Sequence, residues 1–212
     1  MVCHSGGVGI YSERVLPRLV DRTCGVPAND RLRERVCAGL HGRVLEIGFG
    51  SGRNVPFYPA AVSRVSAVEP ADLGWRMAAR RIADSPVPVE RAGLDGQALP
   101  FADNSFDSAL STWTLCTIPE IGTALREVRR VLVPGGTFHF LEHGLAPDAG
   151  VVTWQRRLNP LQQRIAGGCN LNRDIRALLE DAGFEITEVD RFYGVPAPKF
   201  LAAQSLGVAV SP

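Results

Sequence analysis

The chain has 212 residues, 45% of them hydrophobic and 21% charged, a composition that is typical of a globular protein and argues against wholesale disorder. Its 23 lysines and arginines against 22 aspartates and glutamates leave a net charge of +1, so no global electrostatic field would recruit nucleic acid or an anionic membrane. No stretch approaches the ~20 apolar residues of a membrane span, and Met1 to Ser12 lacks the pattern of an export signal.

Predicted helices and strands alternate along one continuous chain. In chain order, the pattern predicts helices over 11–24 and 30–40, strands over 43–47 and 64–68, a helix over 72–82, strands over 86–89 and 107–112, a helix over 119–131, a strand over 137–142, helices over 151–165 and 173–182, and strands over 184–192 and 201–210. This alternation predicts a single α/β domain over residues 1–212, with a mostly parallel sheet and helices on both faces.

Three residues mark the ends of predicted helices. Asn29 offers an N-cap for the second helix, Pro119 stands in the first turn of the helix over 119–131, and Gly183 is a C-terminal stop.

Ligands of mostly parallel sheets bind beyond the carboxyl ends of the strands, where the strand order reverses. The residues that follow each strand are therefore the candidates for function.

The chain has five cysteines, and their number and spacing indicate a redox compartment. Cys3, Cys24, Cys37, Cys116 and Cys169 are odd in number, and no two form a Cys-x-x-Cys pair. This spacing argues against a disulfide framework and against a zinc knuckle, and it fits a reducing environment. We therefore expect a cytoplasmic protein, and we predict no metal-binding residue.

The first predicted strand closes on a glycine-rich loop that contains Gly48, Gly50 and Gly52. Glycines there allow positive φ and let a ligand approach the backbone. A dinucleotide fingerprint would place its third small residue where this chain has Arg53, and no Gly-Lys-Ser/Thr follows for a phosphate loop. Glu46, two residues before the first glycine, could meet a cationic or amine-bearing ligand.

Glu69 closes the second predicted strand, a position from which a carboxylate can bind both hydroxyls of a ribose. The alternative role is that of a helix N-terminal carboxylate stabilised by the helix dipole. Together with Glu46 and the glycine-rich loop, Glu69 is better interpreted as a ribose ligand.

Four segments occur in an order and spacing that resemble a known family. They are 46–52 with its glycines, Glu69, 99–107 (Leu-Pro-Phe-Ala-Asp-Asn-Ser-Phe-Asp) and 132–136 (Leu-Val-Pro-Gly-Gly). From about Gly42 onward the chain resembles the class I S-adenosylmethionine-dependent methyltransferases, closest to those with the common small-molecule methyltransferase domain. The resemblance implies S-adenosylmethionine as cofactor and a Rossmann-like, seven-stranded, mostly parallel sheet whose last strand is antiparallel.

The resemblance also implies which residues hold the cofactor. The glycines would face its methionine part, Glu69 would bind its ribose, and Pro70 would lie against its adenine. Asp95 matches an acidic position that meets the adenine amine, although residues 94–97 read Leu-Asp-Gly-Gln where the family often has Gly-Asp-Ala-Glu. The cofactor-binding residues that we expect are Tyr11, Glu46, Gly48, Gly50, Gly52, Asn54, Glu69, Pro70, Asp95, Gly96, Gln97, Ser111 and Thr112.

The second half of the chain resembles a narrower branch of this family. Residues 111–116, 142–143 and 167–173 look like those of membrane-associated animal thiol methyltransferases and of soluble bacterial relatives. The hydrophobic N-terminal anchor of the animal proteins is absent from the sequence. Some of the bacterial relatives methylate sugar hydroxyls in methylated-mannoside polysaccharide synthesis, and the chain is compatible with that group.

Methyl transfer is an in-line displacement, so the protein must align the acceptor with the methyl group and exclude water. A hydroxyl acceptor also needs a base, whereas a thiol needs less help. His143 follows the fifth predicted strand at its carboxyl end and is the candidate catalytic base, with capping or loop packing as the alternative. His139 fits a core position. Cys116 and Cys169 are interpreted as packed thiols, because direct displacement needs no covalent enzyme intermediate.

Three further side chains are predicted to contact the acceptor. Trp113 follows the fourth strand and could form a wall of the acceptor pocket, with a core position as the alternative. Glu142 adjoins the candidate base, and Trp154 falls in 144–171, the insertion that shapes acceptor specificity in the family. At the other end of the chain, the resemblance implies that residues 1–41, with Tyr11, fold over the cofactor like a lid.

These features predict a methyltransferase that acts on a small-molecule acceptor. We expect transfer from S-adenosylmethionine to a hydroxyl, with a sugar such as a mannoside favoured. S-methylation of a small thiol is the near alternative. A non-catalytic S-adenosylmethionine-binding regulator is the alternative of another class, and a nicotinamide-binding module is disfavoured by Arg53.

Overall fold

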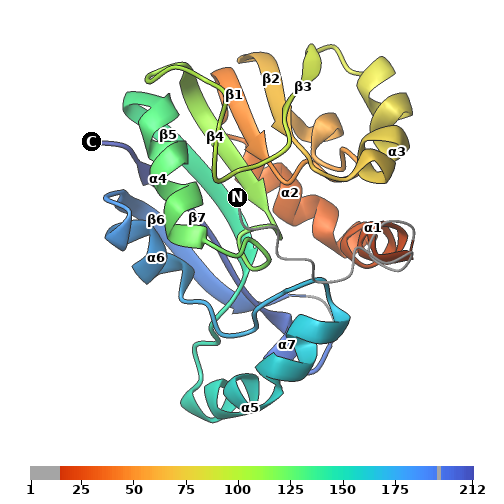
Figure 1. Cartoon of the computed structure of the whole chain (residues 1–212), viewed down its shortest axis with the longest axis vertical. Coiled ribbons are helices and arrows are strands. Elements are labelled where there is room, and N and C mark those ends of the chain that lie inside the picture. Colours follow the sequence, from red (N-terminus) through yellow and green to blue (C-terminus); the bar gives the residue numbers. More distant parts are fainter. Residues whose placement is uncertain (1–14, 195–196) are drawn as a thin grey trace, which may run out of the picture.

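The computed structural model of the chain describes residues 15–194 and 197–212, and its strands form one sheet in the order β3-β2-β1-β4-β5-β7-β6 (Figure 1). The strands are β1 (Gly42–Ile47), β2 (Val62–Val68), β3 (Val89–Gly93), β4 (Phe106–Thr112), β5 (Leu132–His143), β6 (Glu185–Tyr193) and β7 (Ala203–Val210). Strands β1 to β5 pair in parallel, and β7 runs antiparallel to both β5 and β6. The predicted seven-stranded sheet with an antiparallel last strand is confirmed.

Helices cover both faces of this sheet (Figure 1). They are α1 (Leu16–Cys24), α2 (Asp30–Cys37), α3 (Asp72–Ala83), α4 (Ile121–Val131), α5 (Ala149–Ile165), α6 (Ile175–Asp181) and the short α7 (Lys199–Ala202), with single 3₁₀ turns at Pro27–Asn29 and Val55–Phe57. One hydrophobic core gathers side chains of α4 and α6, and a second gathers side chains of α2 and α3. In the two described parts of the chain, no helix combines the length and apolarity that crossing a membrane requires.

Strand β1 shows how one strand supplies both cores. Leu45 and Ile47 belong to the core that includes α4, whereas Val44 belongs to the core that includes α2, because successive side chains of a strand point to opposite faces. All three are buried. This nearly continuous apolar run is typical of a central strand in a parallel sheet.

The third strand and helix α4 both begin later than predicted, and proline explains the shift of the strand. The third strand begins at Val89 rather than at residue 86, because Pro86 and Pro88 have no N–H to donate to the ladder. The carbonyl of Pro88 still accepts a hydrogen bond from Val65 N. Helix α4 begins at Ile121, so Pro119 precedes the helix instead of standing in its first turn.

The two other helix-end predictions had different outcomes. Asn29 precedes α2, but its side-chain amide donates to the Cys24 carbonyl (3.0 Å) and does not cap the helix. Gly183 follows α6 with φ at +88°, and its N–H donates to the Glu180 carbonyl, so it is the predicted C-terminal stop. Asp174 caps the other end of α6 through a hydrogen bond from Ala177 N.

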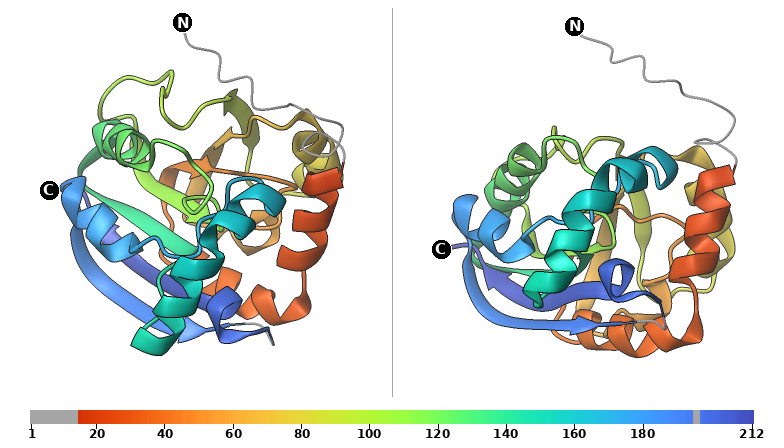
Figure 2. Two further views of the ribbon diagram at one scale, coloured as in Figure 1. Left: turned by 60° about the horizontal axis from the view of Figure 1, so that its bottom comes forward. Right: turned by 90° about the horizontal axis from the view of Figure 1, so that it is seen from below.

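Helices α1 and α5 approach each other beside the carboxyl ends of β1, β2 and β4 (Figure 2). Leu16 at the start of α1 lies against Gly167, just after α5, where an added Cβ would collide with the leucine side chain. Both residues line the same pocket as the loop that follows β1. Helix α1 and the segment just after α5 therefore form part of the wall of that pocket.

Candidate active site

The loop after β1 owes its shape to three glycines in the left-handed region. Gly48, Gly50 and Gly52 have φ of +71°, +56° and +72°. A Cβ on Gly48 would collide with the side chain of Thr114, whereas a Cβ on Gly50 would have only the Gly48 carbonyl oxygen nearby, at 3.9 Å. The loop is therefore packed against the protein at Gly48 and open to a ligand at Gly50.

Glu69, at the end of β2, fixes this loop from the neighbouring strand. One carboxylate oxygen accepts a hydrogen bond from Gly50 N (2.6 Å), and the other accepts one from Ala71 N (2.7 Å). The side chain is only 6% exposed, and burial raises the pKa of its carboxyl group against the opposing effect of these two bonds. Glu69 also lines the pocket, as a ribose ligand would have to.

Glu46 lies beneath the loop rather than in the pocket. Its carboxylate is fully buried and accepts hydrogen bonds from the Asn54 amide (2.9 Å) and the Tyr58 hydroxyl. Burial raises the pKa of Glu46 to about 7. Asn54 also donates to Thr112 Oγ1 (3.0 Å). Glu46 is thus linked to the pocket through Asn54, and its contact with a ligand stays a prediction.

The loop, the ends of the parallel strands and helix α1 enclose one pocket of about 620 Å³. Among the predicted cofactor and acceptor residues, those that line it are Gly48, Gly50, Asn54, Glu69, Pro70, Asp95, Gly96, Gln97, Thr112 and Trp113. Those that do not are Glu46, Gly52, Ser111, Glu142, His143 and Trp154. Tyr11 lies outside the described residues.

One side of the pocket carries the acidic turn after β3. Asp95 accepts hydrogen bonds from the backbone N–H of Gln97 (2.8 Å) and from its side-chain amide (3.2 Å). The Gln97 side-chain oxygen accepts from Glu120 N, which ties the turn to the start of α4. This turn keeps Asp95, Gly96 and Gln97 together on the pocket wall next to Glu69 and Pro70.

The opposite side carries a buried cation that sequence reasoning missed. Arg33 of α2 is 3% exposed, and its guanidinium lies 4.7 Å from the centre of the Trp113 ring. The guanidinium donates to Asn54 Oδ1 (2.5 Å) and to the Cys24 carbonyl (3.2 Å), but Arg33 Nε has no partner. In the sequence, Arg33 is one of three arginines within five residues, and nothing marks it as the inward one.

Helix α1 is attached to the loop after β1 by an ion pair. Asp21 accepts hydrogen bonds from Arg53 Nε (2.7 Å) and Nη2 (2.8 Å) and from the Ser51 hydroxyl. The Arg53 contacts hold the pKa of Asp21 below its usual range. Arg53 therefore anchors the helix that borders the pocket. In the sequence this residue was used only as an argument against a dinucleotide fingerprint.

Glu142 is a buried carboxylate with hydrogen-bond partners inside the protein. It is fully buried at the end of β5, where it accepts hydrogen bonds from the Ser111 hydroxyl (2.7 Å) and from Thr114 N (3.1 Å). Burial raises the pKa of Glu142 to about 7. Ser111 and Glu142 therefore hold the loop after β4 in place. Neither lines the pocket, and their contacts with cofactor and acceptor stay predictions.

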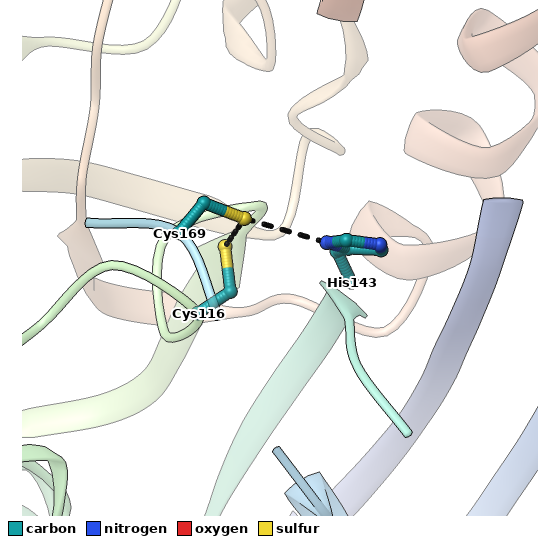
Figure 3. Close-up of side chains that lie close together, drawn as sticks. All are labelled: Cys116, His143 and Cys169. Atoms are coloured by element: carbon teal, nitrogen blue, oxygen red, sulfur yellow. Dashed lines mark hydrogen bonds between the residues drawn. The ribbon is translucent and has the colours of Figure 1, made fainter. Parts of the chain in front are cut away.

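His143 contacts cysteines instead of lining the pocket (Figure 3). Its Nδ1 is 3.4 Å from Cys169 Sγ, and Cys169 Sγ is 3.4 Å from Cys116 Sγ. His143 Nε2 is buried without a partner. The hydrogen bond from the Cys116 thiol is the main cause that lowers the pKa of Cys169 to about 5. This cluster could not be predicted from the sequence, because 53 positions separate the two cysteines.

The two remaining predictions about single side chains concern Trp154 and His139. Trp154 of α5 is 56% exposed, has the Arg157 guanidinium over its ring at 5.7 Å and does not line the pocket, so its contact with the acceptor stays a prediction. His139 is buried with Nδ1 3.0 Å from the Val36 carbonyl and Nε2 3.1 Å from Thr137 Oγ1. Burial lowers the pKa of His139 to about 4, as expected of a core histidine.

A glycine-rich loop after β1, a carboxylate at the end of β2 and an acidic turn after β3 together define a Rossmann-like domain that binds a nucleoside cofactor. Residues 45–140 match the family described as a methyltransferase domain. This match and the strand order place residues 45–140 among the class I S-adenosylmethionine-dependent methyltransferases.

Two human proteins are similar in sequence. Over 155 residues the chain is 36% identical to thiol S-methyltransferase TMT1A of Homo sapiens, a match that covers 69% of this chain and 62% of that protein. Over 161 residues it is 35% identical to thiol S-methyltransferase TMT1B of Homo sapiens, covering 72% and 65%. The chain thus spans less than two thirds of the length of these relatives.

A solved structure supports the fold independently. The S-adenosylmethionine-dependent methyltransferase from Mesorhizobium loti matches with a TM-score of 0.63 and 20% sequence identity, covering 88% of this chain and 99% of that one. At this identity the likeness concerns the fold alone.

The family's cofactor is S-adenosylmethionine, and the residues of the pocket fit it. The pocket volume of about 620 Å³ falls in the range of roughly 300–1,000 Å³ that small-molecule sites have. Gly50 leaves open space where any other residue would place a Cβ toward the cavity. Glu69 presents a carboxylate at the wall, with Pro70 and Asp95 beside it. Glycine loop, carboxylate and acidic turn would hold the methionine, ribose and adenine parts respectively.

Proposed function

We propose that the protein transfers the methyl group of S-adenosylmethionine to the thiol of a small acceptor. The observation that carries this proposal is the buried guanidinium of Arg33, which lines the pocket over Trp113 and has an unpartnered Nε. A cation in a buried site favours a thiolate over a thiol, and the thiolate is the nucleophile. The similarity to two human thiol S-methyltransferases supports the same assignment.

The acidic side chains of the described pocket lining support a thiol more than a hydroxyl. Asp21 is paired with Arg53, Glu69 accepts from two backbone N–H groups, and Asp95 accepts from Gln97. Each carboxylate therefore already accepts hydrogen bonds from the protein, which disfavours proton transfer to it from an acceptor. A hydroxyl needs such a base, whereas a thiol with a pKa near ~8.5 is partly ionised at neutral pH.

Within this proposal the protein mainly binds, orients and excludes water. Bound S-adenosylmethionine supplies an electrophilic methyl group, so no covalent enzyme intermediate is required. The glycine loop and Glu69 hold the cofactor, while Arg33 and Trp113 hold the acceptor sulfur in line with the methyl group. The described part of the predicted lid supplies Leu16 to the pocket wall, and the predicted acceptor-shaping segment 144–171 supplies Gly167.

A second candidate function is the methylation of a hydroxyl on a small acceptor such as a sugar. The observation in its favour is His143 Nε2, which is buried, unpartnered and chemically able to accept a proton. His143 does not line the pocket, so the acceptor would have to reach past the loop after β4. If this function holds, His143→Ala should cut turnover by ~10²–10⁴ while S-adenosylhomocysteine still binds.

One acceptor that carries both groups distinguishes the two functions. The protein is incubated with S-adenosylmethionine and 2-mercaptoethanol, and the position of the new methyl group is read by NMR. Matched pairs of 1-thio sugars and sugars, including mannosides, extend the comparison. We expect methylation on sulfur and none on oxygen. Transfer to a sugar hydroxyl without transfer to any thiol would overturn the thiol proposal in favour of the second candidate.

A further inference from the structure

The cluster of Cys116, His143 and Cys169 joins three segments that are far apart in the sequence (Figure 3). Cys116 lies in the loop after β4, His143 ends β5, and Cys169 follows α5. Their ligand atoms lie within 4.8 Å of one another. The methyl-transfer chemistry proposed above uses none of the three side chains.

The distances within the cluster fit a shared metal ion. Two sulfurs at ~2.3 Å from a tetrahedral ion lie about 3.8 Å apart, and a sulfur and an imidazole nitrogen lie about 3.6 Å apart. The observed separations are 3.4 Å between the two sulfurs and 3.4 Å between Cys169 Sγ and His143 Nδ1. A disulfide would need the sulfurs at about 2.0 Å. Small side-chain movements therefore suffice for a metal ion.

We propose that Cys116, His143 and Cys169 bind a thiophilic divalent cation of the zinc class. Two thiolates and a neutral imidazole are soft ligands that zinc prefers. Two thiolates also cancel the charge of a divalent ion, so the filled site is neutral and suits a buried position. The three protein ligands leave one coordination position for water or a small anion.

The site would brace the wall of the pocket. Cys116 stands between Thr114 and Thr117, and Cys169 stands two residues after Gly167; these three neighbours all line the pocket. An ion between the two cysteines would fix the loop after β4 against the segment after α5. It would also occupy His143 Nδ1, which leaves the proton on Nε2 and removes the histidine as a base. Metal binding itself does not depend on which acceptor the protein uses.

Zinc content and cobalt spectroscopy test the proposal without measuring methyl transfer. The protein is purified without chelators under reducing conditions, and zinc per chain is measured by elemental analysis. We expect about one zinc ion per chain, and cobalt in its place should give a thiolate-to-metal charge-transfer band. Added zinc should raise the melting temperature of the metal-free protein. It should also protect two cysteines from alkylation.

Variants locate the site. Cys116→Ser, Cys169→Ser and the double variant should lose the bound zinc, the cobalt band and the zinc-dependent shift in melting temperature. Cys37→Ala is the matched control, since it removes another buried cysteine and should bind zinc like the parent. Circular dichroism checks folding, and the zinc titration of the parent needs no variant at all.

Two results would overturn the proposal. One is a reduced parent protein that takes up no zinc or cobalt even in excess, including the case in which the two cysteines form a disulfide on oxidation. The other is full metal binding in the folded double variant. Either result leaves the acceptor experiment with 2-mercaptoethanol unaffected, so the two proposals fail separately.

Discussion

At the scale of single residues, the pocket depends on side chains that also make hydrogen bonds within the protein. Glu69 is the example, because its two carboxylate oxygens bind the N–H groups of Gly50 and Ala71. Glu69 also lines the pocket where a ribose would bind. One carboxylate side chain thus both stabilises the loop and lies at the wall of the pocket.

Glu69→Ala should weaken S-adenosylhomocysteine binding at least about tenfold. Charge-assisted hydrogen bonds contribute roughly 1.5–3 kcal/mol, and the variant also frees the glycine loop. Calorimetric titration measures the affinity, with Glu188→Ala on the exposed face of β6 as control. An unchanged affinity in the folded variant would exclude Glu69 from the cofactor site.

Arg33→Met should lower thiol methylation at least about tenfold near neutral pH, equivalent to about 1.4 kcal/mol. The reason is the loss of the cation that favours the thiolate, so raising the pH should recover part of the rate. Arg33→Lys, which keeps the charge, should lose less. Arg31→Met, exposed on the same helix, is the control. If S-adenosylhomocysteine affinity falls in parallel with the rate, Arg33 holds the cofactor instead.

Glu46→Gln should remove a pH dependence of stability. Burial raises the pKa of Glu46 to about 7 in the folded protein from 4.5, so folding favours the protonated carboxyl. Its contribution to stability is full below about pH 4.5 and is lost as the pH rises through about 7. The variant should therefore gain stability relative to the parent between about pH 5 and about pH 8. Urea unfolding at both pH values measures this, and an unchanged difference between the two proteins would contradict it.

At the scale of elements, an ion pair links α1 to the glycine loop. None of its residues is buried, and Asp21 is its charged link to Arg53 and Ser51 beside the glycine loop. The helix nevertheless supplies Leu16, Pro17 and Val20 to the pocket wall. Its position therefore affects the site directly.

Asp21→Ala should loosen α1 and weaken S-adenosylhomocysteine binding by about fivefold, because a partly buried pair of this kind contributes about 1 kcal/mol. Hydrogen exchange over residues 16–24 should become faster. The exposed Arg22→Ala in the same helix should change neither property. Equal exchange rates in the Asp21 variant and the parent would show that apolar contacts alone hold the helix.

The sequence predicted elements best where a local signal marked them. The glycines after β1, Glu69 at the end of β2 and Gly183 after α6 each have a backbone or position that only certain residues suit. The contacts of Arg33 and of the cluster around Cys169 could not be predicted. They join residues that are far apart in the sequence and that come together only in the folded protein. Local chemistry is visible in a sequence, whereas convergence in space is not.

At the scale of the whole molecule, β7 is the strand that closes the sheet, because it lies between β5 and β6. Gly207 in its middle has no room for a side chain: an added Cβ would lie 2.7 Å from Phe140 Cζ and would collide with the Glu188 carbonyl. Residues of both neighbouring strands, β5 and β6, therefore pack closely against β7 at Gly207.

Gly207→Ala should lower the free energy of unfolding by about 1–3 kcal/mol through overpacking. Gly150→Ala is the matched control, since nothing lies within 4 Å of its added Cβ and it stands in helix α5. That substitution should stabilise the protein by about 0.5–1 kcal/mol. Denaturant unfolding of the three proteins measures both effects, and equal stability of the two variants would contradict the packing argument.

The position of β7 also sets an order of assembly during synthesis. Strands β1 to β5 can pair as the ribosome releases them, but β6 emerges before the strand that connects it to the sheet. Until residues 203–210 appear, the edge of β5 and the whole of β6 present unpaired backbone groups, which are templates for aggregation and for chaperone binding. A nascent chain that stalls between β6 and β7 is therefore the species most exposed to misassembly in the cell.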